Sequence, residues 1–247
     1  MTGESYLDAA KSIGAKSSNK GERGITKRLE ALARLTDVAG DRLLDVGCAD
    51  GTYTRRLAEN FQHVDAIDVE PERLHDFRDA IAGTPEAARI TIHRASADDM
   101  PFDDSTFDVA TAIEVLEHVG DLDASLAQIR RVLKPAGKLL LTSPNRWFPI
   151  ETHGFLLRGR RYSGSRAPGL PWVRPLHSRL SDARAFTVRG LGAQVTGHGF
   201  ELLGFDYIMP PFDQSPVGQR IRPFTDAVER SPLRFFGMAL VMAFRKR

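Results

Sequence analysis

The sequence of 247 residues is poor in cysteine and has no long apolar run, and each absence excludes a class of protein. A single cysteine, Cys48, excludes an internal disulfide and any metal site built from four thiolates. The longest apolar stretch, at residues 235–244, is shorter than the ~18 residues that a membrane-spanning helix needs, and it suits a buried strand. The N-terminus also lacks the basic and then apolar pattern of a secretory signal, so we expect a cytoplasmic location.

What is present is the composition of an ordinary folded domain, with 42% hydrophobic and 27% charged residues. The formal net charge is only +2, but the charges are unevenly distributed along the chain. Residues 41–150 carry 12 basic and 20 acidic residues, a net charge of −8. Residues 151–190 carry 8 arginines and 2 acids, a net charge of +6. The sequence therefore combines an acidic body with a short arginine-rich segment.

Hydrophobic periodicity predicts helices that alternate with strands along most of the chain. Helices are expected at residues 22–36, 52–59, 71–82, 122–133 and 186–199. Strands are expected at residues 42–47, 63–69, 89–96, 107–115, 138–144, 200–209 and 233–244. Strands that alternate with helices indicate βαβ units, so the predicted fold class is α/β with a doubly wound, parallel sheet.

A glycine-containing turn follows the first predicted strand, in the segment LLDVGCADG. Gly47, Ala49 and Gly51 stand at every second position just before a predicted helix. Small residues let the backbone approach a ligand closely, and the start of the helix offers free amide groups. The turn differs from the GxGxxG pattern of dinucleotide-binding proteins, because the last glycine follows Ala49 by two residues rather than three.

This segment resembles motif I of the class I S-adenosylmethionine-dependent methyltransferases, and four later segments resemble further motifs of that family in the expected order. They are the strand that ends at Asp68, RASADDMPF, TAIEVLEHV and RRVLKPAGKLLLTSPN. The resemblance implies a Rossmann-like, mostly parallel sheet with an antiparallel last strand, helices on both faces and a lid insertion after strand 5. The stretch SPNRWFPIETHG is similar to the ubiquinone-type O-methyltransferases of the small-molecule branch.

The resemblance also implies a binding site for S-adenosylmethionine. The backbone amides of the turn from Gly47 to Gly51 are expected to face the methionine carboxylate and the ribose. Asp45 is expected to hold the ammonium side, directly or through water. Asp68 is expected to bind the ribose hydroxyls, and Val69 to pack against the adenine.

Three more residues complete the implied cofactor site. Ser96 stands where relatives carry an acid that bonds the adenine amine, which weakens this contact or leaves it to Asp98. Ala97 is expected to offer its backbone amide to the ring, and Glu114 to line the methionine pocket. Ala49 replaces the usual middle glycine, which is tolerable if its φ stays negative.

Histidines are the candidate general bases for methyl transfer to an oxygen. His118 follows the fourth predicted strand and His153 follows the fifth, at the sheet edge where ligands bind in α/β folds. We single out these two as catalytic candidates, ahead of His177 in the insertion. Glu117, His118, Glu151 and His153 do not match a recognised ligand spacing, so no metal site is predicted.

Residues 144–185 break the periodic pattern with clusters of proline, glycine and arginine. We expect this insertion to be a substrate lid. It would follow an N-terminal helical region at residues 1–40 and a cofactor-binding core at residues 41–143. Residues 186–247 are expected to complete the core sheet.

The insertion carries both apolar and positively charged side chains. They are Trp147, Phe148, Phe155, Leu156, Leu157 and Trp172, together with Arg158, Arg160, Arg161, Arg166, Arg174 and Arg179. Such a set suits an acidic or amphipathic acceptor that carries a carboxylate or phosphate. A solvated basic loop and docking to a membrane surface remain as alternatives.

These observations predict a methyltransferase that uses S-adenosylmethionine and a small organic or lipid-like acceptor, methylated at oxygen in preference to nitrogen or carbon. An RNA methyltransferase is an alternative, although lysine is absent from the insertion and no RNA-binding module is recognisable. The others are a nicotinamide-dependent oxidoreductase, which the glycine spacing opposes, and a non-catalytic S-adenosylmethionine-binding protein. The sequence does not predict an oligomeric state.

Overall fold

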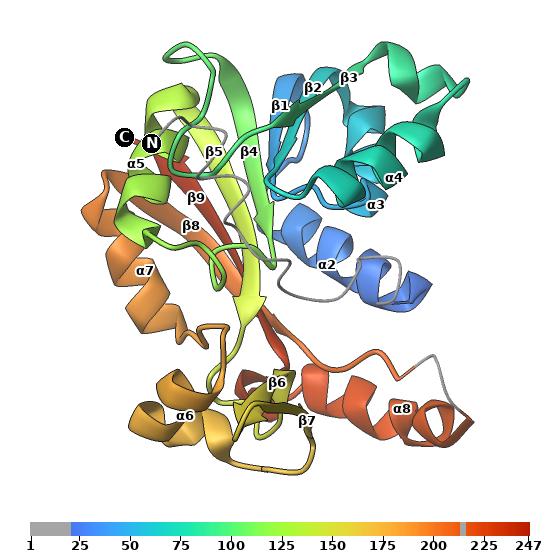
Figure 1. Cartoon of the computed structure of the whole chain (residues 1–247), viewed down its shortest axis with the longest axis vertical. Helices are drawn as coiled ribbons and strands as arrows, with labels where there is room; N and C mark the ends of the chain where they lie inside the picture. The colour runs from blue at the N-terminus through green and yellow to red at the C-terminus, as the bar shows by residue number, and fades with distance from the viewer. Residues whose placement is uncertain (1–20, 213–215) are drawn as a thin grey trace.

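A seven-stranded sheet forms the centre of the computed structural model, which describes residues 21–212 and 216–247 (Figure 1). The strand order is β3-β2-β1-β4-β5-β9-β8. The strands are β1 Gly40–Val46, β2 Phe61–Asp68, β3 Ile90–Arg94, β4 Phe107–Ile113, β5 Leu133–Pro144, β8 Phe200–Ile208 and β9 Ala239–Lys246. Strands β1 to β5 pair in parallel, whereas β9 runs antiparallel to both β5 and β8. The predicted doubly wound fold with an antiparallel last strand is therefore confirmed.

Helices cover both faces of the sheet, as predicted (Figure 1). The helices are α2 Glu22–Leu35, α3 Thr52–Leu57 and α4 Pro71–Ile81 on one face, and α5 Leu122–Val132 and α7 Val188–Gly197 on the other. Successive side chains of a strand point to opposite faces, so Leu43 packs with the first group of helices and Leu44 with the second. Two hydrophobic cores result, one on each side of the sheet.

The register of the parallel strands brings the candidate residues to one edge. Val46 at the end of β1 lies opposite Ile67 of β2 and Ala112 of β4. The segments that follow these three strands therefore leave the sheet at the same carboxyl edge. This is the edge at which open α/β sheets bind their ligands.

The insertion after β5 has more regular structure than its sequence predicts. It contains an antiparallel hairpin of β6 Glu151–Leu157 and β7 Arg160–Gly164, a short 3-10 helix and α6 Arg174–Leu180. A further helix, α8 Pro216–Glu229, was not predicted. The expected strand at 233–244 was predicted too long, because Pro232–Phe236 forms a 3-10 helix before β9. In Figure 1, β6, β7, α6 and α8 lie together beyond the carboxyl edge of the sheet.

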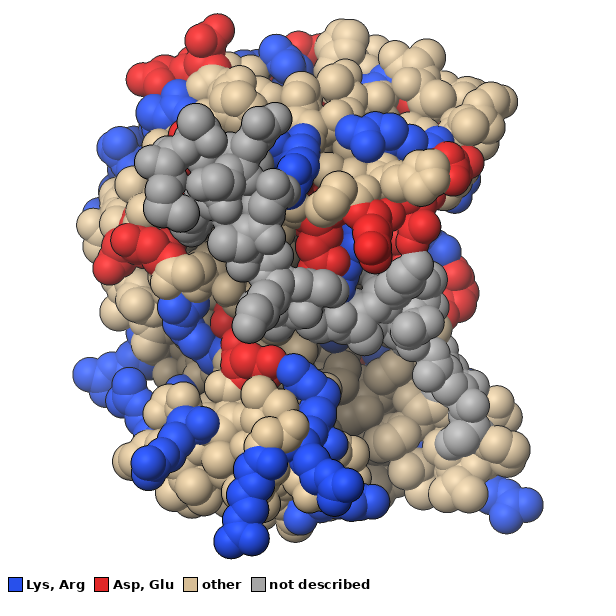
Figure 2. Space-filling model, in the orientation of Figure 1, with Lys and Arg blue, Asp and Glu red and all other residues tan. Residues whose placement is uncertain are grey.

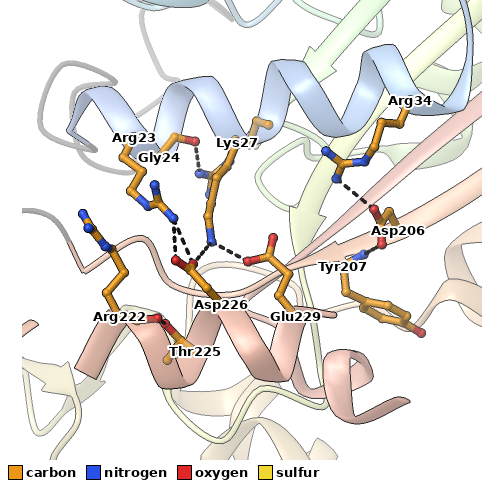
Figure 3. Close-up of polar contacts among 11 residues, drawn as sticks. Arg23, Gly24, Lys27, Arg34, Asp206, Tyr207, Arg222, Thr225, Asp226 and Glu229 are labelled. Atoms are coloured by element: carbon orange, nitrogen blue, oxygen red, sulfur yellow. Dashed lines mark hydrogen bonds and ion pairs between the residues drawn. The ribbon is translucent and has the colours of Figure 1, made fainter. Parts of the chain in front are cut away.

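Ion pairs join α2 to α8 across this end of the molecule (Figure 3). Both Nη2–oxygen distances from Arg23 to the Asp226 carboxylate are below 3 Å, at 2.9 and 2.8 Å. Lys27 bridges Asp226, at 3.2 Å, and Glu229. Helix α2 therefore contacts the sheet on one side and α8 on the other.

The division of the chain into four parts stays a prediction. Residues 1–20 of the expected N-terminal region lie outside the described residues. Within the described part of the chain, we find no helix that is long and apolar enough to cross a membrane.

Candidate active site

The turn after β1 brings the backbone close to its neighbours. Gly47 has a φ of +70°, and a Cβ added there would lie 2.4 Å from Cγ2 of Val115. Gly51 has a φ of +76°, and a Cβ there would lie 2.1 Å from the ring of Phe77. Only glycine fits a positive φ with so little space, so the backbone geometry of the turn requires glycine at both positions.

Ala49 departs from the expectation that its φ is negative. Its φ is +49°, in the left-handed region that favours glycine. Its backbone N–H donates a hydrogen bond of 2.9 Å to Oδ2 of Asp68. The turn therefore keeps the conformation that a glycine would adopt, and the hydrogen bond to the neighbouring strand helps to hold the alanine in it.

Asp68 lies at the end of β2 and faces the turn. Besides Ala49, the backbone N–H of Glu70 donates to this carboxylate, to Oδ1 at 2.9 Å. Burial raises the pKa of Asp68, and the two backbone hydrogen bonds counteract part of that shift. Each carboxylate oxygen has a second lone-pair direction, so the group can still accept from two further hydroxyls.

A cavity of about 380 Å³ opens beside this carboxylate. Six of the nine predicted cofactor residues line it: Gly47, Asp68, Val69, Ser96, Ala97 and Glu114. Its remaining wall includes Val46, Ile67, Val115 and the loop that carries His118. The cavity is large enough for a small ligand and combines apolar walls with a few carboxylates.

Asp45 lies beneath the turn and outside the wall of this cavity. Its two oxygens accept hydrogen bonds from the Thr54 hydroxyl, at 2.5 Å, and the Thr111 hydroxyl, at 2.7 Å. Burial raises the pKa of Asp45 to about 6. The carboxyl group thus connects β1, α3 and β4, and its predicted contact with the cofactor ammonium stays a prediction.

Ser96 and Asp98 lie together on the wall where the adenine is expected. The Ser96 hydroxyl donates a short hydrogen bond to Oδ1 of Asp98, and both residues line the cavity. The serine therefore holds a carboxylate close to the position where relatives have an acid. This arrangement favours the alternative in which Asp98 accepts from the adenine amine.

Glu114 joins the cavity to helix α2. It has a φ of +59°, and its Oε1 accepts from the Thr142 hydroxyl at 2.9 Å and from Nε of Arg28 at 3.3 Å. The Arg28 side chain is only 3% exposed and also donates to the Gly24 carbonyl. Sequence reasoning missed Arg28, because a single arginine in an amphipathic helix carries no signal that it points inward.

The two histidines predicted as catalytic candidates lie against each other. The ring centroids of His118 and His153 are 4.8 Å apart, with nearly perpendicular planes. His118 lines the cavity described above, whereas His153 comes from the hairpin of the insertion. Glu117, His118 and His153 each offer one possible metal-ligand atom, a carboxylate oxygen or a ring nitrogen, and these three atoms lie within 4.8 Å of one another. A carboxylate and two imidazoles in this arrangement could also hold a divalent metal ion.

Glu151 fixes the position of the hairpin beside these histidines. Its oxygens accept from the backbone N–H of His153 at 2.9 Å and from the buried ring of His177 on α6. Burial opposes ionisation of Glu151, but hydrogen bonds from His153 and His177 outweigh it and lower the pKa of Glu151 to about 2. Burial lowers the pKa of His153, but the carboxylates of Glu151, Glu117 and Glu114 outweigh it and raise that pKa.

A second cavity of about 1040 Å³ lies between the insertion and helix α7. Three arginines, Arg146, Arg174 and Arg184, contribute to its wall. His118 and Val119 line this cavity as well as the first one. The insertion therefore contributes to a cavity with three arginines in its wall, and this cavity adjoins the first one at these two residues.

The fold and the turn agree with what comparisons with known proteins show. A family model described as a methyltransferase domain matches residues 44–141. The ubiquinone biosynthesis O-methyltransferase of Xanthomonas oryzae pv. oryzae is 36% identical over 120 residues, which are 48% of this chain and 49% of that protein. The protein of that name from Aromatoleum aromaticum is 28% identical over 73% of this chain and 74% of its own length. The chain thus matches about half the length of the first of these relatives.

Solved structures show the same fold at lower identity. An S-adenosylmethionine-dependent methyltransferase from Mesorhizobium loti superposes with a TM-score of 0.62 at 21% identity, covering 88% of this chain and 96% of that one. The matched residues 44–141 include the turn, Asp68 and the loop after β4. Residues 44–141 of the chain therefore match a methyltransferase domain, and the structure has the fold of solved S-adenosylmethionine-dependent methyltransferases.

Proposed function

We propose that this chain transfers the methyl group of S-adenosylmethionine to an oxygen of a small organic or lipid-like, acidic acceptor. The observation that carries the proposal is the first cavity, at the carboxyl edge of β1, β2 and β4, which we assign to the cofactor and call the cofactor cavity. Its wall brings Gly47, Asp68, Ser96 and Glu114 together with His118. O-methyltransferases among the relatives make oxygen the first choice of methylated atom.

The residues of the turn suit the parts of the cofactor. Asp68 has acceptor capacity left for the ribose hydroxyls, and Val69 offers an apolar surface to the adenine. Asp98 accepts a hydrogen bond from Ser96 on the cavity wall and is our candidate acceptor for the adenine amine. Glu114 lines the cavity and is paired with the buried Arg28, so its carboxylate is our candidate for the wall beside the methionine part of the cofactor.

Bound S-adenosylmethionine supplies a methyl group on a good sulfonium leaving group. The protein can therefore act through proximity and alignment, and a base is needed only to take the proton from the acceptor hydroxyl. We assign this role to His118, which lines both cavities. His153 packs against it from the insertion and positions its ring.

A methyl-transfer assay tests this proposal. Labelled S-adenosylmethionine is incubated with the protein and a pool of small phenols, hydroxy acids and phosphorylated alcohols, and label transferred to an acceptor is measured. We expect transfer by the wild-type chain, and a loss of about 100-fold in rate for His118→Gln. His75→Gln, an exposed histidine on α4, is the matched control and should leave the rate unchanged. Binding of S-adenosylmethionine without transfer to any acceptor would favour the non-catalytic alternative.

We also propose that the outside of the insertion contacts a membrane surface. Several large apolar side chains are exposed there beside arginines: Trp147, Leu156, Leu157, Trp172, Val173 and Leu176. Exposed aromatic and basic side chains suit an anionic lipid headgroup layer. Co-sedimentation with vesicles that contain anionic lipid tests this, and equal recovery with and without vesicles would contradict it.

A further inference from the structure

We infer that the second cavity is the acceptor site and that Arg146 and Arg174 bind an anionic group of the acceptor there, a carboxylate or a phosphate. This inference rests on the proposed methyl transfer.

The wall of the second cavity has more positive than negative charge available to a ligand. Its arginines are Arg146, Arg174 and Arg184, and its carboxylates are Glu117 and Asp182. Asp182 already pairs with Arg161 of the hairpin at 2.5 Å. Glu117 is 1% exposed and accepts from the Ser143 hydroxyl at 3.3 Å. Neither carboxylate forms an ion pair with the three arginines of the wall among the residues that the structure describes.

Arg146 is held in place without a carboxylate. Its guanidinium donates to the carbonyl of Pro171 at 3.3 Å and to the carbonyl of Ala185. Burial lowers the pKa of Arg146, and the nearby charge of Arg174 lowers it further. Two neighbouring guanidinium groups repel each other, and an anion between them would remove that cost.

Arg174 is the more available of the two. Within residues 21–212 and 216–247, it has neither an ion pair nor a hydrogen bond from its side chain. Arg184, in contrast, donates to the carbonyls of Leu116, Val119 and Gly120, which fixes the loop after β4. Arg146 and Arg174 are therefore the pair that a ligand would engage, because a planar guanidinium binds a carboxylate or phosphate through two parallel hydrogen bonds.

The position of the cavity fits an acceptor site. His118 and Val119 line both cavities, so an acceptor in the second cavity has its reacting end next to the cofactor cavity. Phe186, Pro175 and Ala183 add apolar surface to the wall of the same cavity. The acceptor is therefore a small molecule with a methylatable hydroxyl at one end and an anionic group at the other.

The two tryptophans of the chain report on this site. Trp147 adjoins Arg146, and Trp172 lies two residues before Arg174, with its indole N–H on the Trp147 carbonyl at 3.2 Å. We would titrate the complex with S-adenosylhomocysteine with benzoate, phenyl phosphate and the neutral benzamide, and follow tryptophan fluorescence. Benzoate and phenyl phosphate separate a carboxylate preference from a phosphate preference.

We expect at least one anion to bind saturably and at least about tenfold more tightly than benzamide. Arg174→Gln should weaken anion binding by about tenfold. Arg179→Gln is the matched control, because this exposed arginine lies on the same helix and outside the cavity wall, and it should change nothing.

Equal binding of anions and benzamide, anion binding that Arg174→Gln leaves intact, or no saturable anion binding up to about 10 mM would overturn the inference. Calorimetry with S-adenosylhomocysteine is run on each protein in parallel. If the wild type does not bind S-adenosylhomocysteine, the result counts against the proposed methyl transfer. If it binds S-adenosylhomocysteine but no anion, the result counts against the acceptor site alone.

Discussion

Ala49 occupies a backbone conformation that glycine would adopt without strain. A left-handed φ costs an alanine about 1–2 kcal/mol, whereas glycine loses about 0.5–1 kcal/mol through the greater freedom of the unfolded chain. We therefore expect Ala49→Gly to change the free energy of unfolding by no more than about 1 kcal/mol and to leave binding of S-adenosylhomocysteine intact. Denaturant unfolding and calorimetry measure both quantities.

The bulkier variant Ala49→Val tests whether the turn excludes a residue that disfavours a positive φ. A β-branched residue at this φ should destabilise the turn and weaken cofactor binding. If valine were tolerated as well as glycine, the left-handed turn described above would be wrong.

Asp45 should make the fold less stable as the pH rises, which is the opposite of what an ion-paired aspartate does. Its folded pKa of about 6 lies above the ordinary value of 3.8, so the folded state holds a proton that the unfolded state releases. Stability is therefore lost as the pH rises from about 4 to about 6, and the total is on the order of 3 kcal/mol. Asp45→Asn cannot lose a proton, so it should gain stability relative to the wild type between pH 4 and pH 8.

Asp108 provides a control of opposite sign. Burial raises the pKa of Asp108, but hydrogen bonds from Lys134 and from the amides of Arg42 and Asp41 outweigh it and lower that pKa. The stabilisation by Asp108 is therefore present above about pH 4 and is lost as the pH falls below it, so Asp108→Asn should be less stable than the wild type above about pH 4, with a difference that shrinks at lower pH. Urea denaturation of both variants from about pH 2 to pH 8 checks the signs, and parallel curves for Asp45→Asn and wild type would contradict the burial argument.

Among the elements, the core was predictable from the sequence and the insertion was not. Strands such as β4 are continuous apolar runs, and helices such as α5 have apolar residues at helical spacing, so local pattern and tertiary packing agree. The hairpin of β6 and β7 instead depends on distant partners, such as the Glu151 contact with His177. Helix α8 contains Pro223 and is joined to α2 by residues about 200 positions apart.

The candidate site also has a part that the sequence predicted and a part that it did not. The motif order predicted the cavity residues near β1 and β2, because their spacing within one βαβ unit fixes where they lie. The pairing of His118 with His153 was not visible, since only the folded hairpin brings the two rings together. The contact between Arg28 and Glu114 needs the packing of α2 on the sheet, which no local pattern encodes.

The hairpin should depend strongly on its buried carboxylate. Glu151→Gln removes the charge that faces His177 and His153, and we expect a loss of about 2–4 kcal/mol in the free energy of unfolding at neutral pH. Because the folded pKa of Glu151 is about 2, this stabilisation is present above pH 4.5 and is lost as the pH falls towards 2. Glu201→Gln, an exposed glutamate paired with Arg245, is the control. Equal effects of the two variants would contradict the role of Glu151.

On the scale of the whole molecule, the uneven charge of the sequence becomes a division in space. Figure 2 shows lysine and arginine side chains gathered over the end of the molecule where Figure 1 places β6, β7, α6 and α8. Acidic side chains gather nearer the middle of the same face, close to the carboxyl edge of the sheet. The acidic body holds the cofactor cavity, and the basic insertion holds the second one.

The central claim is that the turn after β1 and Asp68 form a cofactor site. Calorimetric titration with S-adenosylhomocysteine tests it most directly, with Asp68→Ala as the variant and the exposed Glu72→Ala of α4 as the control. We predict saturable binding by the wild type and Glu72→Ala, and a loss of affinity of about tenfold or more in Asp68→Ala, because two hydrogen bonds to a carboxylate disappear. Absence of binding by the wild type at about millimolar ligand, or an unchanged affinity in Asp68→Ala, would contradict the account.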